Sequence, residues 1–198
     1  MVVKEIVVAS NNINKLNEIK QIMGDEIKFF SLSSIGFDDD IEENGSIFYE
    51  NALIKAKAVS KFINKPVLAD DSGLVVASLD GAPGIHSARF ARLNATDEEN
   101  NEKLLALLKN HDDRKAKFVC ELVLLFPNNK VIHSVGEVEG SILKSPKGNF
   151  GFGYDPIFYS SELQKAFGEA SCEEKNSVSH RARALRSLFL KIKNLNNL

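Results

Sequence analysis

The sequence lacks the features that mark membrane-spanning, cysteine-ligated metal and nucleic-acid-binding proteins. Its 198 residues contain no apolar stretch close to the roughly 20 residues that a membrane helix needs. Its two cysteines have no CxxC spacing, so we expect no cysteine metal site and a reducing, cytoplasmic setting. The formal net charge of -2 provides no overall basic field, so neither nucleic acid nor a membrane is an expected partner.

The chain also lacks internal repeats, low-complexity tracts and linkers rich in proline, glycine or serine. Its length fits one domain over residues 1–198, organised as a single unit with two lobes. The hydrophobic content of 43% and the charged content of 26% are ordinary for a globular protein. The opening residues, MVVKEIVVAS, are interrupted by charge, which predicts a first strand rather than a signal peptide.

Strand and helix patterns alternate in the first half and give way to adjacent strands in the second. Periodicity and capping signals predict helices over residues 14–23 (ending at Gly24), 47–64 (capped by Ser46), 99–110 (opened by a Thr96–Glu99 capping box) and a final apolar-faced helix. Short strands are expected on either side of Asp70–Asp71, and two adjacent strands are expected around the turn PNN. The predicted fold is α/β, with a mixed sheet, flanking helices and an elongated, two-lobed shape around a central substrate cleft.

The segment ASNNINKLNEI, residues 9–19, places a polar turn between a buried strand and a helix. Unpaired backbone N–H groups and the helix dipole at such a turn can hold a phosphate, and Lys15 adds a full positive charge. Neither GxxxxGK[ST] nor GxGxxG occurs in the chain. In the alternative interpretation, Asn11, Asn12 and Asn14 only form a turn and a helix cap.

Two adjacent aspartates, Asp70 and Asp71, follow the apolar run LA. Their charges repel unless positive charge compensates them. Carboxylates are hard oxygen ligands, and Mg²⁺ commonly takes one or two of them together with waters and substrate phosphates. The acidic run DDDIEE upstream, residues 38–43, supplies further acids. For most of that run a solvated loop is the better interpretation, whereas Asp71 is a candidate metal ligand.

Two later segments suggest a site for a base. GNFGFGYDPIF, residues 148–158, interleaves glycines with aromatic rings on which a base can stack, and Asp155 is expected to be extended because it precedes proline. An aromatic turn that packs on the core is the alternative. EEKNSVSHRARAL, residues 173–185, offers Lys175, His180 and Arg181 beside the last helix, with Ser177 or Ser179 as its cap. His180 on its own is equally consistent with a surface histidine.

These four segments together predict a pocket for a nucleoside triphosphate. As a set they closely resemble the inosine triphosphate pyrophosphatase family, above all in ADDSGL, GAPGIHSAR, GFGYDPIF and SHR, which follow one another in the family's order. The resemblance implies hydrolysis of ITP, dITP and XTP to the monophosphate and pyrophosphate, a mixed α/β fold with two lobes, Mg²⁺ as cofactor and a homodimer.

The resemblance also implies roles for individual residues. The magnesium carboxylates are Glu43 and Asp71, and Asp71 is also the proton acceptor; Glu42 or Asp40 remains an alternative to Glu43. The triphosphate-binding stretch is Ser10, Asn11, Asn12, Ile13, Asn14 and Lys15. The other implied substrate contacts are Lys55, Ser72, Phe152, Gly153, Tyr154, Asp155, Lys175, His180 and Arg181. Asn11 replaces a glycine that many members have, and asparagine tolerates a positive φ.

On this interpretation Mg²⁺, with Lys15 or Lys55, supplies the charge that the aspartate pair needs, and donors near His180 and Arg181 favour a 6-oxo purine over adenine. Three rival functions stay open. They are a related pyrophosphatase for modified pyrimidine or methylated nucleotides, a nucleotide sensor without turnover, and a nucleic-acid-binding module.

Overall fold

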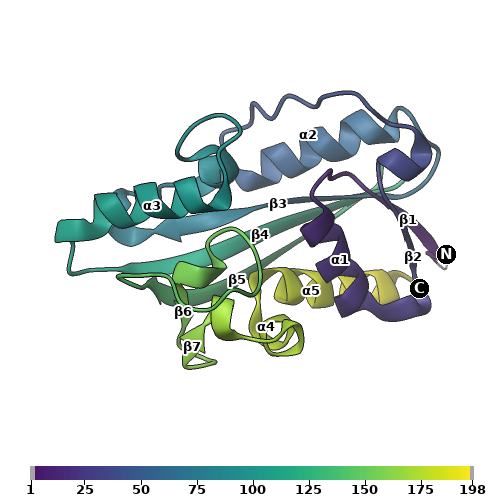
Figure 1. The fold of residues 1–198 in the computed structure, drawn as a ribbon. Coiled ribbons are helices and arrows are strands. Elements are labelled where there is room, and N and C mark those ends of the chain that lie inside the picture. The colour runs from purple at the N-terminus through teal and green to yellow at the C-terminus, as the bar shows by residue number, and fades with distance from the viewer. Residues whose placement is uncertain (1–2, 197–198) are drawn as a thin grey trace. The chain divides into compact units, whose positions relative to one another are not determined.

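The computed structural model describes residues 3–196 and confirms the predicted α/β fold with a mixed sheet. Seven strands form one sheet in the order β2-β1-β3-β4-β5-β6-β7 (Figure 1). The strands are β1 Glu5–Val8, β2 Lys28–Phe30, β3 Val67–Val76, β4 Lys115–Leu125, β5 Val131–Ile142, β6 Phe158–Ser160 and β7 Lys165–Ala166. The helices are α1 Ile13–Met23, α2 Phe48–Ser60, α3 Asp97–Leu107, α4 Cys172–Val178 and α5 His180–Asn196.

The sheet combines parallel and antiparallel pairing. Strand β1 pairs in parallel with β2 and with β3, whereas β6 pairs antiparallel with β5 and with β7. Contacts divide the chain into two compact units, which we call unit 1 (residues 1–71, 120–136 and 181–198) and unit 2 (72–119 and 137–180). The predicted single domain and substrate cleft stay predictions. No helix in residues 3–196 has the length and apolar character needed to cross a bilayer.

Unit 1 buries apolar side chains on both faces of its strands. Alternate residues of a strand point to opposite faces, and the strands here follow that rule. Ile6 and Val8 pack in one cluster with side chains of α1 and α5, while Val7 and Ala9 pack in a second cluster with side chains of α2. Figure 1 shows α2 on one side of these strands and α1 with α5 on the other. Helices therefore cover both faces of the parallel part of the sheet.

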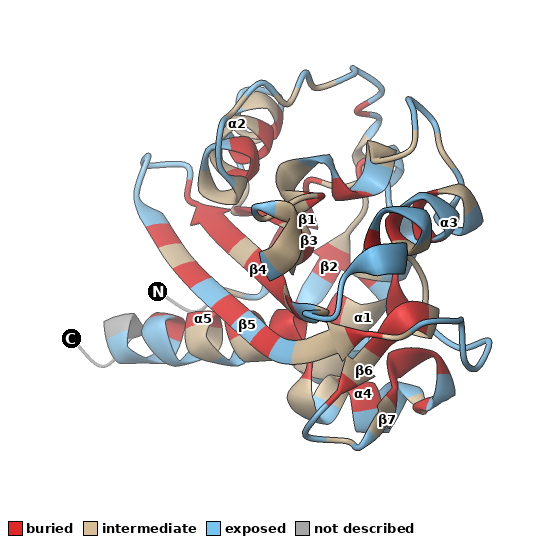
Figure 2. Cartoon of the chain, turned by 90° about the vertical axis from the view of Figure 1, so that its left-hand side faces the viewer, coloured by how far each residue is buried: buried red, intermediate tan, exposed pale blue. Residues whose placement is uncertain are grey.

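Unit 2 is built around an aromatic core. The rings of Phe118 and Phe158 lie 4.7 Å apart between centroids, and Phe167 lies 5.0 Å from Phe158. Leu104 and Leu108, in and directly after α3, join the same cluster and are fully buried. Along β5, buried positions alternate with more exposed ones over most of the strand (Figure 2).

Several local predictions are confirmed. The N-terminal cap of α3 is a Thr96–Glu99 capping box, α1 ends at Gly24, and the last helix buries Leu185, Leu188 and Ile192 as its spacing predicted.

Other local predictions were wrong. Residues 67–76 form one continuous strand instead of two, so Asp70 and Asp71 lie inside β3. Ser46 does not cap α2, because the cap position is Ile47 and the Ser46 hydroxyl donates to Glu50. Asp155 begins a 3-10 helix rather than an extended segment. The short helix α4, opened by a Ser171 capping box, was not predicted.

Gly140 in β5 gives a test of this packing. A Cβ atom there would lie 2.2 Å from the backbone oxygen of Tyr159 and 2.6 Å from the Phe158 ring, so β5 and β6 would have to separate. Overpacking of a buried contact costs roughly 1–3 kcal/mol. We expect Gly140→Ala to lower the free energy of unfolding, measured in urea, by at least about 2 kcal/mol. Glu139→Ala, at an exposed position of the same strand, is the control. Equal stability of the two variants would contradict the close approach of the strands.

Candidate active site

The two aspartates of β3 point to opposite faces of the strand. Leu68, two residues before Asp70, belongs to the cluster shared with α1 and α5, whereas Ala69, two residues before Asp71, belongs to the cluster shared with α2. Since side chains two residues apart in a strand share a face, Asp70 faces α1 and α5 and Asp71 faces α2. The adjacent carboxylates therefore have separate surroundings and separate cationic partners.

Asp70 lies at the centre of a buried ionic network in unit 1. One carboxylate oxygen accepts from Arg181 Nε at 2.7 Å, and the other accepts from Lys15 Nζ at 2.6 Å. Arg181 also pairs with Glu18, and the Cys120 thiol donates to Asp70 at 3.4 Å. Burial acts to raise the pKa of Asp70, but the charges of Arg181 and Lys15 hold this pKa well below its ordinary value. The protein's own cations therefore neutralise Asp70.

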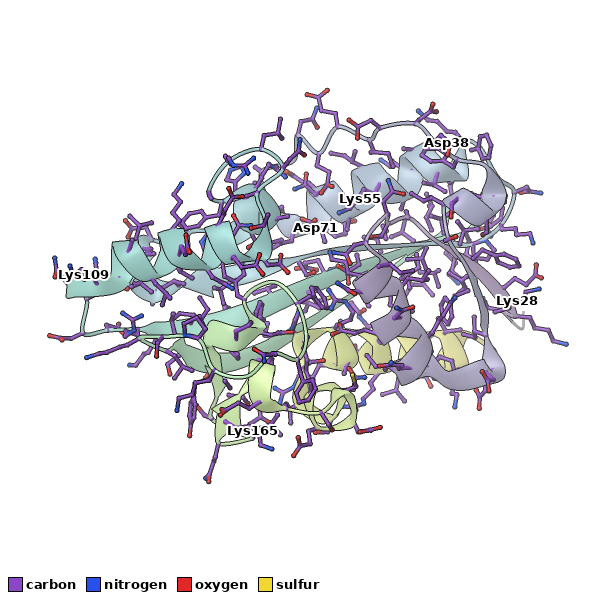
Figure 3. The ribbon with its side chains drawn as sticks, in the orientation of Figure 1. Lys28, Asp38, Lys55, Asp71, Lys109 and Lys165 are labelled. Atoms are coloured by element: carbon purple, nitrogen blue, oxygen red, sulfur yellow. The ribbon has the colours of Figure 1, made fainter. Side chains whose placement is uncertain are left out.

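Asp71 takes part in a second polar group of unit 1, on the face of α2. Lys55 Nζ donates to Asp71 Oδ1 at 2.8 Å and to Glu43 Oε2 at 2.9 Å. Figure 3 shows Lys55 and Asp71 pointing toward one another from α2 and β3. Asn51, one helical turn before Lys55, is fully buried; its Nδ2 donates to Asp71 at 3.4 Å and its Oδ1 accepts from the N–H of Gly45 at 2.8 Å. Asn51 thus ties the loop that carries Glu43 to the strand that carries Asp71.

The two acids of this group have opposite pKa shifts. Burial raises the pKa of Asp71 to about 6, and the charge of Glu43 acts in the same direction. Although burial acts to raise it too, the ammonium group of Lys55 holds the pKa of Glu43 below its ordinary value. We assign the raised pKa to Asp71 because it is 7% exposed, whereas Glu43 is only half-buried. One carboxyl of the pair therefore titrates near neutral pH.

The donor set around Lys55 suits a divalent cation that also binds phosphate. In residues 3–196, no group of three or more histidine, cysteine or acidic side chains could hold a metal ion alone. Mg²⁺ needs only one or two protein carboxylates when phosphates and waters complete its shell. Glu43 and Asp71 meet that requirement because their oxygens converge on a single cationic atom. Glu43 accepts a hydrogen bond from Lys55, whereas Glu42 and Asp40 line a hollow beside Phe62.

The stretch from Ser10 to Lys15 forms the entry to α1. Asn12 caps the helix, because its Oδ1 accepts from the N–H groups of Asn14 and Lys15 at 2.9 and 3.1 Å. The prediction that the N–H groups at this helix start are unpaired was therefore wrong for these two, and a helix cap at Asn12 is confirmed. Asn11 and Ile13 are exposed, and Asn11 is not among the described residues with positive φ. Phosphate binding by this stretch stays a prediction.

The remaining predicted substrate contacts lie in unit 2, apart from Arg181. Asp155 Oδ2 accepts from Lys175 Nζ at 2.6 Å and from the N–H of Phe152 at 2.8 Å. Lys175 Nζ lies 4.6 Å from the centroid of the Phe152 ring. The Tyr154 ring is buried, and its hydroxyl donates to the carbonyl of Ser87 at 2.8 Å. The half-buried Phe152 ring and the buried Lys175–Asp155 ion pair thus lie side by side.

His180 and Ser72 complete the predicted set. The imidazole of His180 is buried and stacks on Phe118, with 4.8 Å between ring centroids and 12° between planes, so it is not a surface histidine. Ser72 is half-buried and follows Asp71 directly in β3.

Sequence reasoning missed several residues that organise the site. Glu18 and Asn51 hold Arg181 and Asp71, and Asp97 and Asn101 contact Gly153. The spacing of four residues between Asn51 and Lys55 on a helix was the signal that could have found Asn51.

Comparisons with known proteins agree with the resemblance drawn from the motifs. The model of the Ham1 family matches residues 6–191. A dITP/XTP pyrophosphatase of Clostridium perfringens is 45% identical over 194 residues, covering 93% of this chain and 95% of that protein. A dITP/XTP pyrophosphatase of Bacillus subtilis is 44% identical over 193 residues, covering 95% and 96%. The solved structure of the Staphylococcus aureus Ham1 protein has a TM-score of 0.87 and 45% identity, covering 96% of this chain and 99% of that one.

The ionic network around Asp70 gives one test of these assignments. Removing one partner of a buried ion pair typically costs about 3–5 kcal/mol because a charge is left uncompensated. We expect Asp70→Asn to lower the free energy of unfolding in urea by about 3 kcal/mol. The control is Glu5→Gln, which breaks the exposed Lys65–Glu5 pair and should leave stability nearly unchanged. If Asp70→Asn lowered the free energy of unfolding as little as the control does, the buried ion pairs of Asp70 would not stabilise the fold.

The raised pKa of Asp71 gives a second test, in metal-free buffer. Between pH 3.8 and about 6, folded Asp71 keeps a proton that the unfolded chain has lost, so stability falls as the pH rises through this window. A shift of one pKa unit corresponds to about 1.4 kcal/mol. We therefore expect the free energy of unfolding of Asp71→Asn at pH 8 to be higher than that of the wild type by roughly 2–3 kcal/mol. The difference should shrink toward zero below pH 4.

Glu43→Gln is the matched variant for this measurement. Because the pKa of Glu43 is lowered, its carboxylate contributes stability above its ordinary pKa, and the substitution should be destabilising at pH 8. A pH-independent difference for Asp71→Asn would show that Asp71 titrates normally.

Proposed function

The chain belongs to the Ham1 family, and we propose that it hydrolyses nonstandard purine nucleoside triphosphates such as dITP, ITP and XTP to the monophosphate and pyrophosphate. The observation that carries this proposal is the convergence of Glu43 and Asp71 on Lys55, with the three residues supplied by a loop, a strand and a helix. The names of the relatives, which are dITP/XTP pyrophosphatases, support the substrate class.

In this proposal Asp71 accepts the proton of the attacking water. A general base works best with a pKa near the working pH, and burial raises the pKa of Asp71 to about 6. Lys55 holds the carboxylate in one orientation through its hydrogen bond of 2.8 Å. Since Lys55 also contacts Glu43, it keeps the two acids together before substrate arrives.

The cofactor that we propose is Mg²⁺, held by Glu43 and Asp71. When bound, it supplies positive charge that stabilises the phosphates as their negative charge is redistributed. Lys15 adds positive charge at the start of α1, and Asp70 fixes the position of its ammonium group at 2.6 Å. In phosphoryl chemistry such positioning and charge stabilisation account for most of the rate enhancement.

For the base, we propose the group around Phe152, Asp155 and Lys175, with His180 in support. A 6-oxo purine has an acceptor where adenine has an amino donor, so donors at that position select against adenine. Lys175 is a donor placed beside the Phe152 ring, which is consistent with this role. We keep Arg181 in the proposed substrate set, although its contacts with Asp70 and Glu18 also give it a role in holding Asp70.

Two further features of the proposal come from the resemblance and the cysteines. We propose a homodimer, as the family resemblance implies. We also propose a cytoplasmic setting, because the chain has two unpaired cysteines, buried Cys120 and exposed Cys172, and thiols persist in reducing compartments.

Product analysis tests the function directly. With ITP and Mg²⁺, we expect IMP and pyrophosphate rather than IDP and phosphate, and far slower turnover of ATP. Asp71→Asn should lower kcat by about 100-fold or more, while the KM for ITP changes little, because the residue acts in the reaction step. Faster turnover of modified pyrimidine or methylated nucleotides would favour the related pyrophosphatase. Nucleotide binding without product would indicate a sensor.

A further inference from the structure

Helix α3 holds both polar groups of one peptide residue in the proposed base-binding run. Asp97 Oδ2 accepts a hydrogen bond from the N–H of Gly153 at 2.6 Å. Asn101 Nδ2 donates to the carbonyl oxygen of Gly153 at 3.1 Å. The two side chains are four residues apart on α3, so they lie one turn apart on the same face of the helix. We call this pair and its two hydrogen bonds the Gly153 clamp.

The clamp acts on a residue whose conformation few other residues can adopt. Gly153 has φ +62°, in the left-handed region that favours glycine. Its neighbour Phe152 is held on the other side by Asp155, which accepts from the Phe152 N–H. The backbone that carries the Phe152 ring is therefore held from two directions, by Asp155 at Phe152 and by the clamp at Gly153.

The buried face of α3 is unusual for a helix that serves packing alone. Its buried residues are Asn100, Asn101 and Leu104. Asparagine is a poor helix former, and burying its amide costs free energy unless it is hydrogen-bonded. Asn101 Oδ1 is a buried oxygen that has no hydrogen-bond partner within residues 3–196. An apolar side chain at position 101 would avoid that cost, so the asparagine needs another reason to be there.

The side chain of Asn100 likewise forms hydrogen bonds with the backbone of a loop. Its Nδ2 donates to the carbonyl of Ala88 at 3.3 Å, and its Oδ1 accepts from the N–H of Ala91 at 2.8 Å. Ser87 directly precedes the segment that Asn100 holds, and its carbonyl accepts from the hydroxyl of Tyr154. Adjacent asparagines of α3 thus fix the run 152–155 directly and through GAPGIHSARFA, for which the sequence alone indicated no role.

Resting on the proposed function, we propose that Asp97 and Asn101 are positioning residues for base recognition. They set the place of the Gly153 backbone and of the Phe152 ring, and thereby the preference for a 6-oxo purine over adenine. Neither residue belongs to the group around Asp71 and Lys55, so the reaction step does not depend on them. Selectivity does, because donors placed for a 6-oxo purine discriminate against adenine only when the base is held in the matching position.

The test compares four variants with the wild type. Asn101→Ala and Asp97→Ala each remove one half of the clamp. Asp97→Asn keeps an acceptor oxygen for the Gly153 N–H and is the conservative rescue. Glu102→Ala, at an exposed position of the same helix, is the matched control. For each protein, kcat and KM are measured with ITP and with ATP in Mg²⁺, together with the melting temperature.

We expect both alanine variants of the clamp to raise the KM for ITP and to lower the ratio of kcat/KM for ITP over ATP by about 10-fold, with little change in kcat. Asp97→Asn and Glu102→Ala should behave as the wild type. Because Asp97 is exposed, its alanine variant remains informative if Asn101→Ala does not fold.

A purely structural role predicts a different result. In that case the melting temperature falls while the ITP-to-ATP ratio stays at the wild-type value, and the inference is overturned. Failure of the proposed function looks different again, because the wild type itself would then release no pyrophosphate from ITP. If the wild type is active and the variants keep its ratio of kcat/KM for ITP over ATP, only the role of the clamp in base recognition is overturned.

Discussion

The alternation of side chains along β3 is the constraint on which the rest of unit 1 depends. It directs Asp70 to the face covered by α1 and α5, and Asp71 to the face covered by α2. Two carboxylates that are adjacent in the chain thus avoid sharing one environment. Asp70 is neutralised by Arg181 and Lys15, whereas Asp71 shares Lys55 with a second acid.

The two environments give the aspartates different chemistry. Cations hold the pKa of Asp70 far down, so it stays ionised and serves to fix the groups around it. Burial raises the pKa of Asp71 to about 6, within the range in which a proton can be taken up and released. Pairs of acids whose pKa values are driven apart are typical of sites that separate a structural charge from a reactive one. In this structure the strand separates the two carboxylates, with α1 and α5 on the face of Asp70 and α2 on the face of Asp71.

Sequence patterns predicted the parts of this arrangement that depend on nearby residues. The Thr96–Glu99 capping box, the end of α1 at Gly24 and the buried side of α5 each follow from residues within a turn or two. The continuous strand β3 was missed because Ser72 and Gly73 are typical turn residues, and their inclusion in a strand depends on pairing with distant strands. Contacts such as Arg181 with Asp70 join residues 111 positions apart, which no local pattern reveals.

The candidate site shows the same division. The family resemblance implied Glu43 and Asp71 as metal ligands and Lys55 as a substrate contact, and the structure brings these three together. The side chains that hold them, such as Asn51, and those that hold the run 152–155, such as Asn101, were not among the residues that the sequence identified. Their importance lies in which backbone groups they meet, and that is a property of the tertiary structure.

The placement of the aspartates inside β3 also limits how this chain can change in length. Because a strand repeats every two residues, inserting or deleting one residue ahead of Asp70 within the strand would exchange the faces of both carboxylates. An insertion would bring Asp70 to the place where Asp71 now contacts Lys55, and a deletion would bring Asp71 to the place where Asp70 now contacts Arg181. In either case the present ion pairs of both acids would be lost. Surface loops generally tolerate insertions and deletions, whereas a change of one residue within this strand would move both carboxylates to the opposite faces.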